Sequence, residues 1–150
     1  MSKRWGTPTW LFLHTIVEKI YNDECYKKMS NDVVNIIVLI FKNLPCPLCR
    51  NHAVSYIKKY NIYNVKTKDG MITYLFTFHN WVNKRVGNGI KQKSILDLYK
   101  RANTVNICKY FIQEFFKSNA LSKDFFQWKK DTLKSEINNF LAKNKLYIKP

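Results

Sequence analysis

Apolar residues recur at the spacing of an α-helix along nearly the whole chain. In the first segment they follow the i, i+3, i+4 rule of a one-sided helix, at Trp10, Leu13, Ile16, Val17 and Ile20. We expect Thr7 to cap this helix and Pro8 to be its first residue, because proline there removes no helical hydrogen bond. A second helix is expected from Ser30 or Asn31 to about Asn43. Its apolar residues lie on nearly every side, which predicts a central position.

Four further helices are predicted, over residues 47–60, 70–86, 94–116 and 122–145. A proline ends the second helix, and the two glycines of "GNG" end the fourth. The last helix is amphipathic and rich in lysine, so we expect it to pack on the rest of the protein. No segment has a convincing strand pattern, so the predicted fold class is all-α, a helix bundle.

The composition supports a packed domain with a large positive charge. Hydrophobic residues make up 46% of the 150 residues, which is enough for a core and excludes a globally disordered chain. The 26 lysines and arginines against 10 acidic residues give a net charge of +16, which attracts nucleic acid, anionic membrane or acidic protein. Lysine, asparagine and isoleucine are all abundant, as AT-biased coding would produce, so the charge alone does not identify a ligand.

The chain carries no visible targeting segment. Its first ten residues lack the apolar region of a secretory signal. The longest apolar run, from Val33 to Phe41, is far shorter than the ~20 residues of a membrane span. We therefore expect a soluble protein, in which four cysteines are too few for a disulfide scaffold.

The stretch "LPCPLCRNH" contains a CxxC pair at the start of the third helix. Cys46 is the expected N-cap and Pro47 the first helical residue, which places Cys49 about one turn into the helix. The two sulfurs are then close enough to form a disulfide with modest adjustment. The positive end of the helix dipole stabilises thiolates there, and Arg50 and His52 add positive charge. These features favour a reversible redox dithiol.

Other roles for the pair are possible on the sequence alone. A structural zinc site needs four ligands, and no candidate has the usual spacing among Cys25, Cys108, His14, His52 and His79. Haem attachment needs a histidine directly after the second cysteine, where the chain has arginine, and a thioredoxin fold needs strands. A basic zinc- or nucleic-acid-binding helical module with a non-catalytic CxxC remains the alternative hypothesis.

Two further segments place polar side chains on apolar helix faces. Trp10 and His14 are four residues apart in the first helix, and His79 and Asn83 are four residues apart in the fourth. Polar groups inside a bundle need hydrogen-bond partners. A planar cofactor with polar edges, lying between helices, would supply them.

Three motifs occur in order: "RWGTPTWLFLH", "PCPLC" and "HNWVN". Together they resemble the FAD-linked sulfhydryl oxidases of the Erv/ALR type, most closely the small enzymes of large eukaryotic DNA viruses. The resemblance covers roughly residues 4–99. It implies a four-helix bundle with a short fifth helix that binds FAD, here with an appended C-terminal helix. We accordingly divide the chain into an oxidase domain, residues 1–116, and a basic amphipathic C-terminal helical extension, residues 117–150.

The resemblance also implies an activity and roles for residues. The enzyme would form disulfide bonds in protein dithiols and pass the electrons through the CxxC pair to FAD and then to O2, giving H2O2. Cys49 matches the cysteine that faces the flavin, and Cys46 matches the cysteine that exchanges with substrate. No metal is implied. The cofactor-binding positions of the family fall on Arg4, Trp5, Gly6, Trp10, His14, His79, Asn80, Val82, Asn83, Lys84, Lys91 and Tyr99.

The chain departs from the family pattern in two places. After the "HNWVN" motif the family commonly has a Leu-Gly-Lys or Leu-Asn-Lys run. Here the chain reads Val86-Gly87-Asn88-Gly89, and a basic residue follows only at Lys91. The second structural cysteine pair of cellular members and a separate shuttle dithiol are missing. Cys46 is therefore expected to accept substrate thiols directly.

The resemblance implies partners and a location as well. The expected partners are protein dithiols, which include viral structural or redox proteins, molecular oxygen and a second copy of the chain in a homodimer. Neither a membrane span nor nucleic acid is expected. The expected location is the host cytoplasm or the virion.

Overall fold

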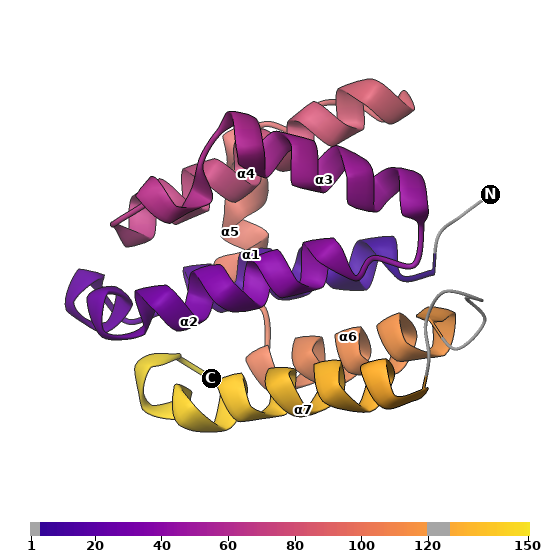
Figure 1. Ribbon diagram of the computed structural model, residues 1–150. Helices are drawn as coiled ribbons and strands as arrows, with labels where there is room; N and C mark the ends of the chain where they lie inside the picture. The colour runs from indigo at the N-terminus through magenta and orange to yellow at the C-terminus, as the bar shows by residue number, and fades with distance from the viewer. Residues whose placement is uncertain (1–3, 120–126) are drawn as a thin grey trace.

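The computed structural model describes residues 4–119 and 127–150, and this part of the chain is helical between short connections (Figure 1). Apart from one isolated bridge between Ile20 and Ile148, the described residues form no β-structure, so the predicted all-α class is confirmed. The helices are α1 (Gly6–Glu18), α2 (Asp23–Lys42), α3 (Pro47–Lys59), α4 (Lys68–Val86), α5 (Leu96–Arg101), α6 (Thr104–Asn119) and α7 (Gln127–Lys143). Short 3-10 turns occupy Ile62–Asn64, Lys93–Ile95 and Lys145–Tyr147.

The helices form three layers, which Figure 1 shows one above another. The α1–α2 pair lies in the middle, the α3–α4 pair covers one side of it, and the α6–α7 pair covers the other side. α1 packs against α4, α5 and α6, while α2 packs against α3 and α7. Each central helix therefore contacts both outer layers.

α2 has the central position that its apolar pattern predicts. Its buried residues lie on several sides of the helix, and Val33, Ile37 and Ile40 are almost completely buried. Its predicted start at Ser30 or Asn31 is wrong, because the helix begins at Asp23. The side chain of Asn22 accepts a hydrogen bond from the Cys25 N–H at 2.9 Å and caps the helix there.

The start of α1 also differs from the prediction. Thr7 is not the cap, because the helix begins one residue earlier, at Gly6, with Trp5 in the N-cap position. The Trp5 carbonyl accepts the Thr9 N–H at 3.1 Å and also the Thr9 hydroxyl. Pro8 therefore lies in the first turn, where its missing N–H still removes no helical hydrogen bond.

The predicted fifth helix, residues 94–116, is wrong as one element. Its first residues form a 3-10 turn, α5 ends at Arg101, and Ala102 has an extended backbone with ψ 149°. The Asn103 side chain then accepts the Asn106 N–H at 3.0 Å and caps the start of α6. The break lets α6 turn back along α1, where Phe111 stacks on Phe12 with ring centroids 4.3 Å apart.

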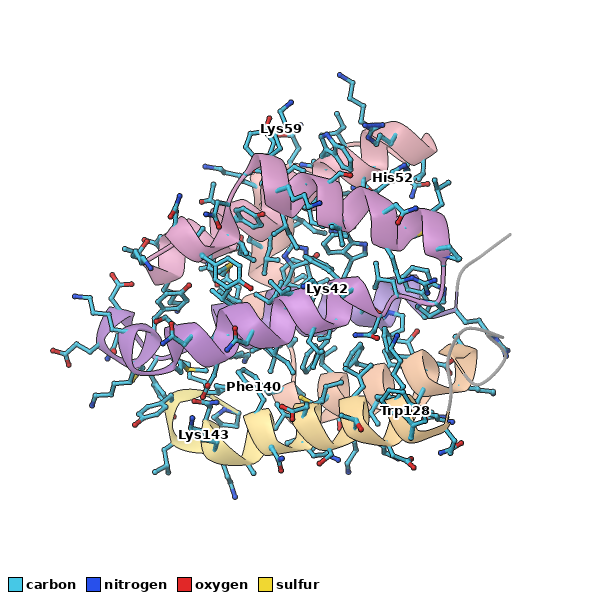
Figure 2. All side chains as sticks on the ribbon, viewed as in Figure 1. Lys42, His52, Lys59, Trp128, Phe140 and Lys143 are labelled. Atoms are coloured by element: carbon cyan, nitrogen blue, oxygen red, sulfur yellow. A yellow bond between two sulfur atoms is a disulfide. The ribbon has the colours of Figure 1, made fainter. Side chains whose placement is uncertain are left out.

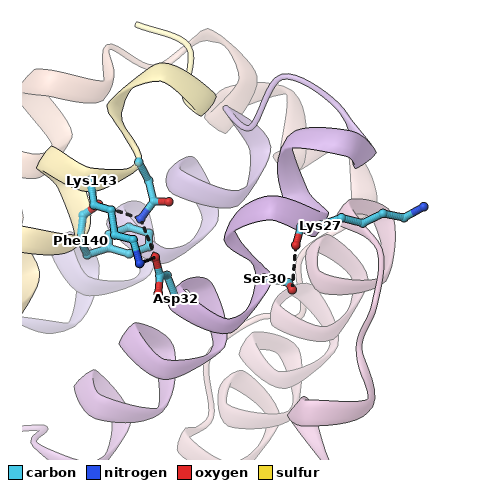
Figure 3. Close-up of polar contacts among 6 residues, drawn as sticks. Lys27, Ser30, Asp32, Phe140 and Lys143 are labelled. Carbon is cyan, nitrogen blue, oxygen red and sulfur yellow. Dashed lines mark hydrogen bonds and ion pairs between the residues drawn. The ribbon is translucent and has the colours of Figure 1, made fainter.

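α7 packs on α2 through apolar and polar contacts. Its residues Leu133, Ile137 and Phe140 are buried, as expected for an amphipathic helix that packs on the bundle. Lys143 forms a 3.0 Å ion pair with Asp32 of α2, which Figure 3 shows beside Phe140. The predicted start of this helix at residue 122 lies outside the described residues.

The residues after α7 are held to the end of α1. The Lys149 N–H donates to the Lys19 carbonyl at 2.7 Å, and the Tyr21 N–H donates to the Tyr147 carbonyl at 3.1 Å. The proposed domain boundary at residue 116 lies within α6, and the division into two domains stays a prediction. Over residues 4–119 and 127–150, no helix is both long and apolar enough to cross a bilayer.

Candidate redox and cofactor site

Cys46 and Cys49 are joined by a disulfide where α2 gives way to α3. Cys46 is the N-cap of α3 in an extended conformation, and Pro47 is the first helical residue, as predicted. The Cα atoms of the two cysteines are 5.1 Å apart. The Cys49 N–H donates to the Cys46 sulfur at 3.2 Å. A thiolate on Cys46 would accept the same bond at the positive end of the helix dipole.

Basic and aromatic side chains surround the disulfide. The Arg50 guanidinium donates to the Leu44 carbonyl at 2.7 Å, so its side chain reaches back across the CxxC turn. His52, labelled near the start of α3 in Figure 2, makes an edge contact with the Trp81 ring, with centroids 6.0 Å apart. Arg85 lies over the same Trp81 ring at 4.1 Å. Arg50 therefore places positive charge beside the redox pair, and Arg85 adds positive charge at the Trp81 contact between α3 and α4.

Four aromatic rings from α1, α4 and α5 form a stack in the core. Trp10 and His79 are nearly parallel, with centroids 3.9 Å apart and an interplanar angle of 6°. His14 and Tyr99 stack at 4.5 Å and 12°. His14 Nε2 and His79 Nδ1 are 3.0 Å apart and share a hydrogen bond. The structure therefore brings together four of the predicted cofactor residues from three separate segments.

Both stacked histidines are held in the neutral form. Burial, with a smaller contribution from the nearby His79, lowers the pKa of His14 to about 3. Burial lowers the pKa of His79 to about 4, with a contribution from the positive charge of Lys91. At neutral pH an N–H of one ring donates a hydrogen bond to the bare nitrogen of the other, and the pair adds no charge to the core.

A hydrogen-bonded loop carries Lys91 close to this stack. The Asn80 side chain accepts the Lys91 N–H at 2.9 Å and donates to the Lys91 carbonyl at 3.0 Å. Asn83, which is buried, donates to the Asn80 side-chain oxygen at 3.3 Å. The loop begins at Gly87, whose φ of 78° ends α4 in the left-handed region. Asn80 thus holds the backbone of Lys91 in place, and Lys91 lies close to the end of α4 although the Leu-Gly-Lys run of the family is missing.

A shallow depression of about 320 Å³ lies next to this loop. Its lining residues are Lys91, Gln92, Ser94, Ile95, Leu98 and Arg101. FAD combines a flat aromatic ring system with a negatively charged pyrophosphate. The stack offers flat rings, and two basic side chains line the neighbouring depression, so the residues present fit the two halves of this cofactor.

The remaining predicted cofactor residues lie outside the ring stack. Arg4 and Lys84 are exposed, while Trp5 packs on the edge of the core at the start of α1. Gly6 is the first residue of α1, and Val82 is half-buried on α4. Arg4, Trp5 and Gly6 lie at or just before the start of α1, and Val82 and Lys84 lie on α4.

Sequence reasoning missed three residues at the site. Phe78 and Phe41 contact the Trp10 ring, with centroid distances of 5.6 and 6.2 Å. Phe78 directly precedes the "HNWVN" motif, so its position was a usable signal. Arg101 lies on the same short helix as Tyr99. Among the described residues, no group of three His, Cys, Asp or Glu side chains is placed to hold a metal ion.

The Erv1/Alr family model matches residues 7–101, which is more than half of the chain. The chain belongs to the Erv1/Alr family. The predicted resemblance is therefore confirmed. The match spans α1 to α5 and includes the disulfide, the ring stack and the Lys91 loop, while α6 and α7 lie beyond it.

Viral proteins are among the relatives of this Erv1/Alr chain. A FAD-linked sulfhydryl oxidase of African swine fever virus is 33% identical over 86 residues, which are 57% of this chain and 71% of the relative. The same enzyme from another isolate of that virus is 31% identical over 86 residues, with the same coverage. A protein of Invertebrate iridescent virus 3, named for the same kind of oxidase, is 30% identical over 100 residues, 65% of this chain and 67% of the relative. No solved structure matches the chain significantly.

Proposed function

We propose that this Erv1/Alr protein is a FAD-linked sulfhydryl oxidase that forms disulfide bonds in protein dithiols. The viral relatives carry the name of that activity. The observation that carries the proposal is the Cys46–Cys49 disulfide at the N-terminus of α3, half-buried and therefore within reach of a substrate thiol. A disulfide in this position can be exchanged, whereas a purely structural one is usually buried.

The exchange proceeds in two steps that balance in electrons. A substrate thiolate attacks the Cys46 sulfur, the Cys46–Cys49 bond breaks, and Cys49 leaves as a thiolate. The second substrate thiolate then attacks the first substrate sulfur, the mixed disulfide breaks, and Cys46 leaves as a thiolate. The substrate has lost two electrons, which the cysteine pair now holds. The bond from the Cys49 N–H to the Cys46 sulfur supports the proposal, because it stabilises the leaving thiolate of the second step.

The cofactor residues have separate tasks in this proposal. Trp10, His14, His79 and Tyr99 hold the ring system between α1, α4 and α5, and Lys91 binds the pyrophosphate. Bound FAD supplies the acceptor for the electron pair of the cysteines, and molecular oxygen then takes that pair to give H2O2. Neutral histidines suit this role, since they bind polar ring edges through hydrogen bonds and add no unpaired charge to the core.

The remaining parts of the proposal rest on the family. They are the use of oxygen, assembly as a homodimer, viral proteins as substrates, and a location in the host cytoplasm or the virion. Light scattering of the purified protein tests the dimer directly. A mass near 17.9 kDa, that of one chain, would contradict it.

The first test of the activity is the visible spectrum of the purified protein. We expect a flavin band near about 450 nm that dithiothreitol bleaches and air restores. Cys49→Ser is expected to keep the band and lose turnover, while Cys25→Ser, a matched thiol removal on α2, keeps both. A protein that stays colourless after incubation with FAD, or a Cys49→Ser variant with full turnover, would refute the proposal.

A further inference from the structure

The layer that carries the disulfide contains almost no negative charge. Between residues 33 and 96 there is one carboxylate, Asp69. The same stretch has basic residues at Lys42, Arg50, Lys58, Lys59, Lys66, Lys68, Lys84, Arg85, Lys91 and Lys93. It includes the CxxC pair, α3 and α4, which form one outer layer of the fold in Figure 1. The layer formed by α3 and α4 therefore has a net positive charge.

The one carboxylate of this stretch lies far from the disulfide. Asp69 is in the first turn of α4, next to Lys68, whose N–H donates to Asp23 at 2.9 Å. Asp23 begins α2, whereas Cys46 follows the other end of that helix. A helix of 20 residues is about 30 Å long. Asp69 and Asp23 therefore cannot neutralise charge beside the redox pair.

Exposed and half-exposed side chains lead from the disulfide to the end of α4. Leu48, between the two cysteines, is 63% exposed. His52 is one turn beyond Cys49 on the same face of α3, and its ring contacts the edge of Trp81. The Arg85 guanidinium lies over the Trp81 ring. The ion pairs of Lys100 with Asp97 and of Lys143 with Asp32 lie away from these side chains. We name the patch of Leu48, His52, Trp81 and Arg85 the Leu48–Arg85 surface.

We infer that the Leu48–Arg85 surface docks acidic polypeptide segments, so that the substrates are dithiols flanked by Asp and Glu side chains. This inference rests on the proposed oxidase function. Leu48 offers an apolar contact beside the exchanging sulfur, and Arg85 attracts carboxylates a few residues along the substrate. Charge complementarity of this kind raises the rate of encounter more than the strength of the complex, so its effect belongs in kcat/KM.

Nucleic acid is the other polyanion that a basic surface attracts. The observations favour a polypeptide, because the patch includes an exposed leucine and adjoins a disulfide that only a thiol can use. Binding to phosphate backbones is, moreover, expected of clustered Lys and Arg without an apolar centre. A DNA duplex therefore serves as one arm of the test.

The experiment compares three substrates on the flavin-loaded protein. They are dithiothreitol and two reduced peptides with one CxxC pair, flanked either by four glutamates or by four glutamines. We expect the glutamate peptide to have a kcat/KM about 10-fold higher at low ionic strength, with the gap closing as salt screens the charges. Arg85→Gln is expected to lower the glutamate-to-glutamine ratio by about 3-fold. Lys59→Gln, at the other end of α3 in Figure 2, removes the same charge and leaves the ratio unchanged.

The outcomes distinguish a failure of the docking inference from a failure of the proposed oxidase function. If dithiothreitol is oxidised but both peptides react equally at low salt, the docking inference is wrong and the oxidase remains. If the flavin-loaded protein oxidises no dithiol, the oxidase proposal itself fails. If Arg85→Gln weakens binding of a DNA duplex and leaves the peptide ratio intact, the surface is one for nucleic acid and the inference is overturned. The salt dependence of the unmodified protein decides the point even if the variant does not fold.

Discussion

The buried histidine pair predicts that acid destabilises this protein well above the pH at which most carboxylates titrate. Burial lowers the pKa of His14 to about 3 and that of His79 to about 4, from an ordinary value of 6.5. In the unfolded chain both rings take up a proton near pH 6.5. In the folded protein they do so only near pH 3 to 4. Between these limits the unfolded chain binds more protons, so the free energy of unfolding falls as the pH is lowered.

The magnitude follows from the proton linkage. From pH 7.5 to pH 5.0, each histidine that the fold keeps unprotonated lowers the free energy of unfolding by about 2 kcal/mol, so the pair lowers it by about 4 kcal/mol. Glu18 acts in the opposite sense, because burial raises its pKa and the folded protein then holds the extra proton. The test therefore compares the pH dependence of the unmodified protein with that of a histidine variant, in which the contribution of Glu18 is the same and cancels.

The assay is urea unfolding at pH 7.5 and pH 5.0, followed by circular dichroism. His79→Gln removes one of the two excluded protons, so we expect its loss on acidification to be about 2 kcal/mol smaller than that of the unmodified protein. His52→Gln is the matched control, since His52 lies outside the ring stack, and its loss is expected to equal that of the unmodified protein. An equal loss in His79→Gln would show that neither burial nor the His14–His79 bond excludes the proton.

Two further predictions concern the fold that holds the site. Ile137→Ala removes a completely buried side chain of α7 and is expected to cost about 3 kcal/mol, or on the order of 10 °C in melting temperature, whereas Leu146→Ala, at an 86% exposed position, changes little. If the two variants melt alike in a calorimeter, α7 is not part of the cooperative core. Gly87→Ala places a side chain at φ 78° and is expected to cost about 1 to 2 kcal/mol in urea unfolding, whereas Gly89→Ala, without a positive φ, is nearly neutral. Equal midpoints for the two alanine variants would contradict the assigned helix end.

Much of the local structure could be predicted from the sequence because its signals are local. Proline on either side of Cys46 limits the backbone there, so the start of α3 was predictable to the residue. The glycine at 87 similarly marked the end of α4. The start of α2 was missed because Asn22, eight residues before the predicted cap, already satisfies a free N–H of the first turn. Local signals decide such ends only when one candidate cap is clearly stronger than its neighbours.

The candidate site was only partly predictable. Helical spacing put Trp10 with His14 and His79 with Asn83, each on one helix face. It could not show that Trp10 stacks on His79, since the two residues are on different helices. Nor could it show that Asn80 fastens the Lys91 loop, because that bond depends on the path of the chain after Gly87.

The sequence by itself determined the all-α class, the helix that the CxxC pair begins, and membership of the Erv1/Alr family. These follow from periodicity, from proline and glycine positions, and from motif order. Such signals depend on neighbouring residues or on which residue type stands at a position, so they need no knowledge of tertiary contacts. Only the tertiary structure decided that the predicted fifth helix breaks at Ala102, so that α6 returns along α1 and α7 packs on α2. It also decided that His52 of α3 and Arg85 of α4 meet at the Trp81 ring. Packing of distant segments sets burial, and burial sets both the neutral state of His14 and His79 and the exposure of Leu48.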